Sequence, residues 1–144
     1  QGEVSPEQVM ENFREEYLNK KEPLHFRKLR VDDLSDTIDS EFDTHVKVIY
    51  TDHGVEHSFE AVGNGPIDAV RRGLAEQLNV NIKVLDYEEH ALQSGSNSQA
   101  AAYIHLLDGE TGHVTYGVGV SSNITRASIR AVFSAMNRLG LGEH

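Results

Sequence analysis

Hydrophobic and polar residues alternate along two stretches in the first half of the chain, 44–50 and 55–61. In the first stretch, Val46, Val48 and Tyr50 fall on one face, and the residues between them are a lysine and an isoleucine. A period of two is typical of a strand with one buried face. The sequence Thr-Asp-His-Gly between the two stretches is a turn sequence, so together they predict a β-hairpin.

The apolar spacing changes to that of a helix just after this hairpin. Pro66 suits the first turn of a helix, and the glycines before it let the backbone enter at angles that other residues resist. The apolar stripe of the predicted helix consists of Ile67, Val70, Leu74 and Leu78. Gly73 lies within that stripe and weakens a helix by about 1 kcal/mol relative to alanine. We therefore expect another backbone to pack closely at Gly73.

The second half of the chain repeats this order of elements. In the first half, a strand predicted over 24–31 precedes the hairpin. In the second half, strands are predicted over 81–89, 100–107 and 113–120. A second helix follows residues 121–123, which are candidates for its N-cap. Its stripe consists of Ile124, Ala127, Ala131, Ala135 and Leu139. The pattern predicts an α+β fold made of two βββα units, 24–80 and 81–140, in which each unit buries the apolar face of the other.

The ends of the chain are assigned separately from these units. Residues 1–4 are interpreted as linker or tag residues, and 141–144 as a tail. Ser5 and Pro6 have the pattern of an N-cap and a first helical residue, and the apolar residues that follow are spaced four apart. A linker helix is therefore predicted within 5–23, ending at the charged stretch before Pro23.

Composition narrows the functional classes. The 144 residues fit one domain or two small lobes, and the 13 basic and 23 acidic residues give a formal charge of −10. This charge opposes binding to nucleic acid or to anionic membranes. The absence of cysteine excludes disulfides and cysteine-based zinc sites, and no apolar run is long enough to cross a membrane. We expect a soluble cytoplasmic protein.

No complete catalytic or metal-binding motif is present. His53 and His57 are four residues apart, but a glycine between them favours a hairpin over the helical face that binds zinc. The acidic stretch 32–43 has no glycine for the bend of a calcium loop and is interpreted as a solvated loop. Glu89 and His90 are neighbours in a predicted strand, where successive side chains point to opposite faces. Binding is therefore favoured over catalysis.

A site for a small ligand is consistent with the two helix starts. Backbone N–H groups near 66–69 and 124–126 can hold a carboxylate. The stretch 93–98 carries Ser, Gly and Asn between two strands, which is typical of a binding loop. Candidate partners for a ligand ammonium group are Asp68, Asp86, Asn97 and Gln99. Candidates to receive an aliphatic side chain are Val84, Ala91, Ala100 and Ile124.

Three ordered motifs carry a resemblance to a known family. They are Gly-Asn-Gly-Pro-Ile-Asp-Ala at 63–69, Leu-Asp-Tyr-Glu-Glu-His-Ala at 85–91, and Gly-Val-Gly at 117–119 followed by Ile-Thr-Arg-Ala-Ser at 124–128. From Leu24 to Leu139 the chain resembles the C-terminal regulatory domain of 2-isopropylmalate synthase of the actinobacterial type. The resemblance implies two βββα units related by a pseudo-two-fold axis.

The resemblance also implies a function. L-Leucine would be the allosteric effector of a homodimer and would inhibit the condensation of acetyl-CoA with 2-oxoisovalerate. Catalysis and its divalent metal would belong to an upstream TIM barrel that these residues do not contain, so this chain would be non-catalytic and would hold no cofactor. By motif position, the implied leucine site comprises Asn64, Gly65, Pro66, Ile67, Asp68, Val84, Tyr87, Ala91, Ser98, Gln99, Ala100 and Ile124. Asp68 and Ser98 stand where small apolar residues are expected.

Three alternatives stay open from the sequence. The related effector domain of citramalate synthase would prefer isoleucine, and a difference of one methyl position shifts affinity by only about 1–3 kcal/mol. A purely structural dimerisation domain would bind no effector. An independent enzyme would transfer acyl groups without a further domain.

Overall fold

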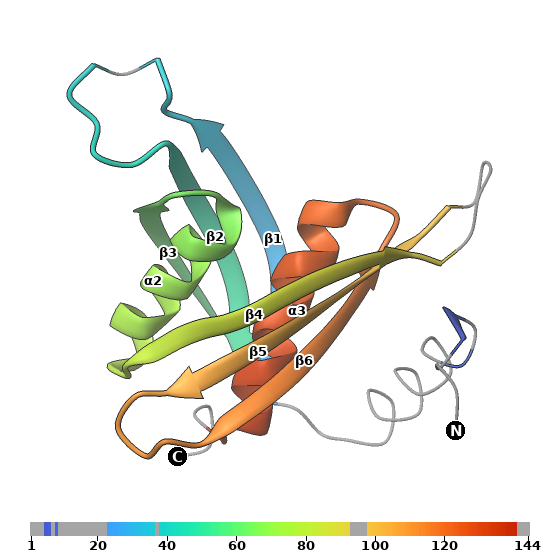
Figure 1. The fold of residues 1–144 in the computed structure, drawn as a ribbon. Coiled ribbons are helices and arrows are strands. Elements are labelled where there is room, and N and C mark those ends of the chain that lie inside the picture. The colour runs from blue at the N-terminus through green and yellow to red at the C-terminus, as the bar shows by residue number, and fades with distance from the viewer. Residues whose placement is uncertain (1–4, 7, 9–22, 37, 93–97, 141–144) are drawn as a thin grey trace.

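Two three-stranded antiparallel sheets, each followed by a helix, form the part of the chain that is described by the computed structural model, residues 5, 6, 8, 23–36, 38–92 and 98–140. The elements are β1 (Leu24–Asp33), β2 (Thr44–Asp52), β3 (Val55–Gly63), α2 (Pro66–Leu78), β4 (Ile82–Ala91), β5 (Ala100–Asp108), β6 (Val114–Ser121) and α3 (Ile124–Arg138). Their order confirms the predicted α+β fold of two βββα units (Figure 1).

The predicted hairpin is present in the first sheet, which has the order β1-β2-β3. Val46, Val48 and Tyr50 are almost completely buried, as the alternation predicts. Strand β1 continues to Asp33, two residues further than expected, because Asp32 and Asp33 pair with His45 and Thr44 of β2. The solvated loop predicted over 32–43 is therefore wrong at its start, where backbone pairing in the sheet outweighs the low strand preference of aspartate.

Helix α2 packs closely on its own sheet at Gly73, but the predicted backbone neighbour is wrong. A Cβ atom built on Gly73 would overlap the ring of Phe59 and would lie 3.0 Å from the Cβ of Ala61, both on β3. The neighbour is thus a pair of side chains rather than another backbone. Phe59 occupies the space that a larger residue at position 73 would need.

The second sheet has the order β4-β5-β6, and a register shift between Val84 and Asp86 decides which side chains of β4 face inward. Beyond this shift, Tyr87 and Glu89 pair with Ile104 and Ala102, which belong to the buried core. Because side chains alternate along a strand, Tyr87, Glu89 and Ala91 share the face turned toward α3. We call this the inner face.

Helix α3 lies unusually close to the second sheet. A Cβ atom on Gly119 would overlap the carbonyl oxygen of Ala127 and would lie 2.6 Å from the backbone nitrogen of Ala131. Gly117 is crowded in the same way one turn further along the helix. Of the predicted N-cap candidates, Asn123 is the one used, and its Oδ1 accepts from the backbone N–H of Arg126 at 2.9 Å.

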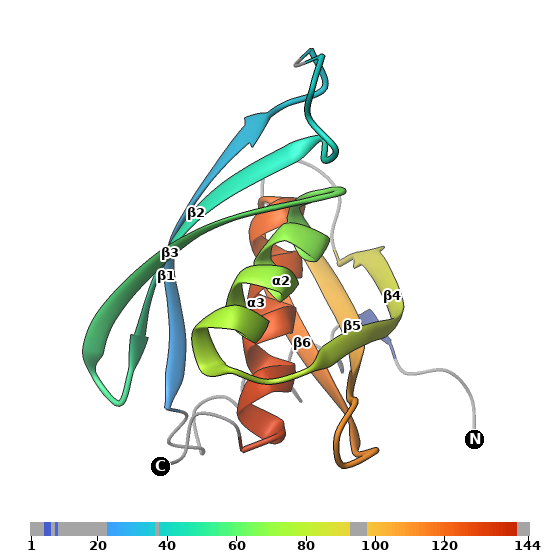
Figure 2. The ribbon, with the colours of Figure 1, turned by 90° about the vertical axis from the view of Figure 1, so that its left-hand side faces the viewer.

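Both helices lie between the two sheets and share one core with them (Figure 2). Asn137, near the end of α3, accepts from the backbone N–H of Leu24 at 2.9 Å and donates to its carbonyl oxygen at 2.8 Å. The two units are thereby joined across the molecule. Both helices begin at the same end of the molecule, opposite the β5–β6 turn (Figures 1 and 2).

Few residues of the N-terminal segment are described. The backbone N–H of Gln8 donates to Ser5 Oγ at 3.1 Å, the contact expected of a serine N-cap. The rest of the predicted linker helix lies outside the described residues, as do residues 93–97 and the tail. Within the part that is described, no helix is long and apolar enough to span a membrane.

Candidate functional site

The start of α2 has no side-chain cap. Gly65 occupies the N-cap position with φ 94° and supplies no side-chain oxygen to the first turn. Its own backbone N–H is held by Asp43 Oδ1 at 3.0 Å and Thr44 Oγ1 at 3.2 Å, which fixes the turn before the helix. Because proline has no N–H, the donors of this first turn belong to Ile67 and Asp68. The positive end of α2 is therefore fixed in place and open to an anion.

The Asp68 carboxylate is held by residues of its own helix and of the turn before it. Its Oδ1 is 2.8 Å from Arg71 Nη2, while its Oδ2 accepts from Arg72 Nε at 2.9 Å and from the backbone N–H of Asn64 at 2.9 Å. Burial acts to raise the pKa of Asp68, but the hydrogen bonds from Asn64, Arg71 and Arg72 outweigh it and hold that pKa below its usual value. Asp68, a candidate partner for a ligand ammonium group, thus already accepts three hydrogen bonds from the protein.

A cleft of about 540 Å³ lies between α2 and the start of β4. Its lining consists of Asn64, Ile67, Asp68, Arg71, Asn81, Lys83 and Val84. Four of these, Asn64, Ile67, Asp68 and Val84, belong to the site predicted from the sequence. Arg71 crosses this cleft, since its Nη1 also donates to the carbonyl oxygen of Ile82 at 3.0 Å.

Tyr87 connects β4 to the start of α3. Its hydroxyl lies 2.6 Å from Ser128 Oγ, and Ser128 donates to the carbonyl oxygen of Ile124 at 2.8 Å. Burial, and then the Glu89 carboxylate at 2.5 Å, raise the pKa of Tyr87. Two residues of the predicted site, Tyr87 and Ile124, are thus brought together through a serine.

Three more predicted residues meet at the end of the second sheet beside α3. Ala91 pairs with Ala100, Ala100 pairs with Ser121 of β6, and α3 begins three residues later. The backbone N–H of Leu92 donates to the carbonyl oxygen of Gln99 at 2.8 Å, which closes the base of the intervening loop. Ala91 is exposed, so it presents a small side chain at this edge.

The predicted site therefore forms two groups. One is at the start of α2 and the beginning of β4, and comprises Asn64, Gly65, Pro66, Ile67, Asp68 and Val84. The other is at the start of α3 and the far end of the second sheet, and comprises Tyr87, Ala91, Gln99, Ala100 and Ile124. Ser98 lies next to Gln99 and is exposed. Strand β4 belongs to both groups and connects them.

The profile of the LeuA allosteric (dimerisation) domain matches residues 3–140. The chain belongs to this family. Similar proteins named 2-isopropylmalate synthase are found in Clostridium acetobutylicum, 35% identical over 94% of this chain and 24% of the relative, and in Mycobacterium leprae, 39% identical over 95% and 22%. One from a Parafrankia strain is 52% identical over 59% of this chain and 14% of the relative. The Clostridium and Mycobacterium relatives match nearly all of this chain, but the chain spans only about a quarter of their length.

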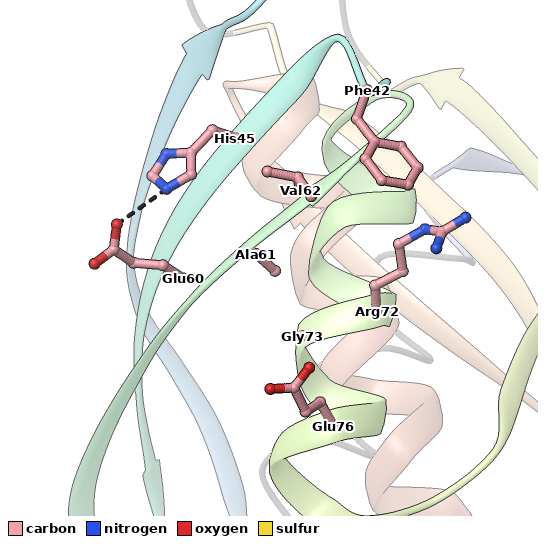
Figure 3. A pocket seen from close by; sticks show the side chains of 8 residues that line it. All are labelled: Phe42, His45, Glu60, Ala61, Val62, Arg72, Gly73 and Glu76. Atoms are coloured by element: carbon pink, nitrogen blue, oxygen red, sulfur yellow. Dashed lines mark hydrogen bonds and ion pairs between the residues drawn. The ribbon is translucent and has the colours of Figure 1, made fainter. Parts of the chain in front are cut away.

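A second cleft, of about 420 Å³, opens on the other side of α2 in this LeuA dimerisation domain (Figure 3). It contains none of the predicted site residues. Arg72 lies 4.7 Å from the ring centre of Phe42, and His45 Nε2 lies 3.0 Å from Glu60 Oε1 across the sheet. These contacts engage Arg72, His45 and Glu60 of this cleft.

Candidates for catalysis or metal binding do not come together in the described part of the domain. His53 adopts a positive φ in the turn and contacts its neighbour Asp52, whereas His57 stacks on Tyr50 with ring centres 5.4 Å apart. Glu89 and His90 point to opposite faces of the sheet, as expected. Among the described residues, no group of three or more His, Asp or Glu side chains is arranged to hold a metal ion.

Several residues around the two helix starts of this domain are not among those predicted from the sequence. Arg71 is three residues after Asp68 and Ser128 is four after Ile124, so helical spacing could have assigned both to the same face as a predicted site residue. Glu89 lies two residues from Tyr87 and from Ala91, and a strand period of two indicates a shared face. Lys83 gives no such signal, because its place in the cleft depends on how β4 crosses α2.

Proposed function

We propose that this chain is the leucine-binding feedback-regulatory and dimerisation domain of a 2-isopropylmalate synthase. The observation that supports this most strongly is the family match over residues 3–140, together with relatives that carry this enzyme name. In the proposal, the whole enzyme is a homodimeric acyltransferase that condenses acetyl-CoA with 2-oxoisovalerate. The present chain contributes regulation and subunit contacts, and the metal-dependent chemistry belongs to a separate catalytic domain.

Leucine would bind near the two helix starts. The uncapped first turn of α2, at Ile67 and Asp68, offers backbone N–H groups to the leucine carboxylate. Val84, Ala91 and Ile124 would enclose the isobutyl group, while Tyr87 and Gln99 line the site. The small exposed side chain of Ala91 and the partial exposure of Ile124, at 38%, leave apolar surface that a ligand can cover.

Feedback inhibition needs more than tight binding. Leucine must bind one state of the enzyme better than another, because a ligand with equal affinity for two states shifts neither. Strand β4 is suited to carry such a difference, since it contacts α2 at one end and α3 at the other. In this proposal, leucine changes how the two βββα units sit on each other and thereby how the dimer holds its catalytic domains.

Isothermal titration of this chain with leucine, isoleucine and valine tests the proposal. We expect saturable binding with leucine tightest, and a difference from each competitor of about tenfold or more, the size of one displaced or missing methyl group. Tightest binding of isoleucine would instead favour a citramalate synthase effector domain. No heat and no thermal stabilisation at millimolar leucine would favour a purely structural dimerisation domain.

A further inference from the structure

The contacts around Tyr87 contain one hydrogen too few. Tyr87 and Ser128 each have one hydroxyl hydrogen, but they take part in three close contacts: with Glu89 at 2.5 Å, with each other at 2.6 Å, and with the carbonyl oxygen of Ile124 at 2.8 Å. A carboxylate and a carbonyl oxygen can only accept. Whichever way the two hydroxyls turn, one of the three contacts has no hydrogen in it.

Glu89 is the point at which an additional donor can enter. It is exposed, it lies on the inner face between two residues of the proposed leucine site, Tyr87 and Ala91, and it pairs with Ala102 across the sheet. Among the described residues, no lysine, arginine or histidine forms an ion pair with Glu89. Within the described part of the chain, the Tyr87 hydroxyl is the one donor to this carboxylate.

The other candidate carboxylates, Asp68 and Asp86, already accept hydrogen bonds elsewhere. Both oxygens of Asp68 are occupied by Arg71, Arg72 and the backbone of Asn64. Asp86 pairs with His105, whose side chain is exposed on the outer face, and it accepts from the backbone N–H of Tyr87. Of these three acidic side chains, Glu89 alone faces α3.

We propose that Glu89 accepts the α-ammonium group of the bound amino acid, which makes it a specificity residue of the effector site. This inference rests on the proposed function. The ammonium group enters between Glu89 and Tyr87 and donates one N–H to the Glu89 carboxylate and another to the Tyr87 hydroxyl, which then turns to donate to Ser128. Ser128 keeps its bond to the carbonyl oxygen of Ile124, so every contact in the chain from ligand to α3 contains one hydrogen.

The arrangement predicts selection for amino acids over acids of the same shape. A ligand without the ammonium group would leave the chain one hydrogen short and would bring a second anion near the Glu89 carboxylate. An amino acid corrects both defects at once. The same contact also supplies a hydrogen to the Tyr87–Ser128 contact at the start of α3. Ligand binding therefore affects the hydrogen bonds that lead to Ile124.

Glu89→Gln tests this, because the amide keeps the size and the acceptor oxygen but removes the charge. Titrations use the 144-residue chain with leucine and with 4-methylpentanoate, which is leucine without its amino group. In E89Q we expect leucine affinity to fall at least about tenfold, the usual size of a lost charge-assisted hydrogen bond. Affinity for 4-methylpentanoate should not fall. Glu88→Gln, on the outer face, is the matched control and should bind leucine like the wild type.

The outcomes separate this inference from the proposed function. If the wild type binds leucine and E89Q binds it equally well, Glu89 is not the ammonium acceptor, although the domain still binds leucine. If the wild type binds no leucine, both proposals fail. Circular dichroism verifies the fold of E89Q. Should that variant not fold, Glu89→Asp keeps the charge on a shorter side chain, and a smaller loss confined to leucine is expected; an equal loss for both ligands would contradict the inference.

Discussion

The two βββα units solve the same packing problem in opposite ways. In the first unit the glycine is on the helix, at Gly73, and the sheet supplies the bulky Phe59 that occupies the space. In the second unit the glycines are on the sheet, at Gly117 and Gly119, and the backbone of α3 itself occupies the space. One topology thus accommodates two distributions of small and large residues, provided that their sum fits the gap.

This difference gives the two helices different roles. Four residues of α2 are buried against eight of α3, and only α3 has a side-chain cap, from Asn123. Helix α3 is therefore embedded in the core that both sheets share. Helix α2 keeps its first turn uncapped and a cleft along its side. The second unit therefore supplies the rigid frame, whereas the first has an uncapped helix start that would hold the ligand in the proposed function.

The largest effect is expected from Gly119→Ala. Its Cβ meets the backbone of α3 at Ala127 and Ala131, which can yield only if the whole helix moves. We expect the free energy of unfolding to fall by about 3 kcal/mol, the upper range for overpacking. Urea denaturation followed by circular dichroism measures this, with Gly112→Ala as control. Gly112 has φ 78° and open space around it, so its loss should be about 1 kcal/mol, from backbone strain alone. Equal losses would contradict the tight packing of α3.

A smaller effect is expected from Gly73→Ala, because its neighbour is a side chain. The added methyl group meets the ring of Phe59, while alanine improves helix propensity by about 1 kcal/mol. We expect a net loss of about 1 kcal/mol, since overpacking costs more than the propensity gains. In a Phe59→Leu background the same substitution should be neutral or stabilising. A loss of the same size in both backgrounds would show that Phe59 is not the neighbour that matters.

The sequence predicts the elements, but it does not show how side chains are arranged around the candidate site, for a physical reason. Alternation identifies β2 and helical spacing identifies α2 because both patterns are local. The inward placement of Glu89 depends on the register shift between Val84 and Asp86, and the occupied state of Asp68 depends on two arginines that turn back toward it. Neither is visible in periodicity. The close approach of α3 could be predicted only by knowing which glycines face the helix, and this depends on the three-dimensional packing.

The smallest effect concerns the charges at the start of α2. The pKa of Asp68 is lowered in the folded state, so its contribution is present above its unfolded value of about 4 and is lost as the pH falls through the folded pKa. Asp68→Asn should therefore cost stability at pH 6 and progressively less below pH of about 4. Because these ion pairs are partly exposed, we expect the free energy of unfolding to fall by less than about 1 kcal/mol. Unfolding curves at several pH values measure it, with Glu76→Gln on the same helix as control. A constant difference across pH would contradict this account.

Backbone amide NMR during a leucine titration tests the central claim most directly, namely that the two helix starts together bind leucine. We predict that the N–H signals of residues 67–69 and 124–126 shift together and saturate at one leucine concentration. Signals of the β5–β6 turn, residues 109–112, lie at the opposite end of the molecule and should not move (Figure 1). No saturable shifts, or shifts confined to one helix start or to the β5–β6 turn, would contradict it.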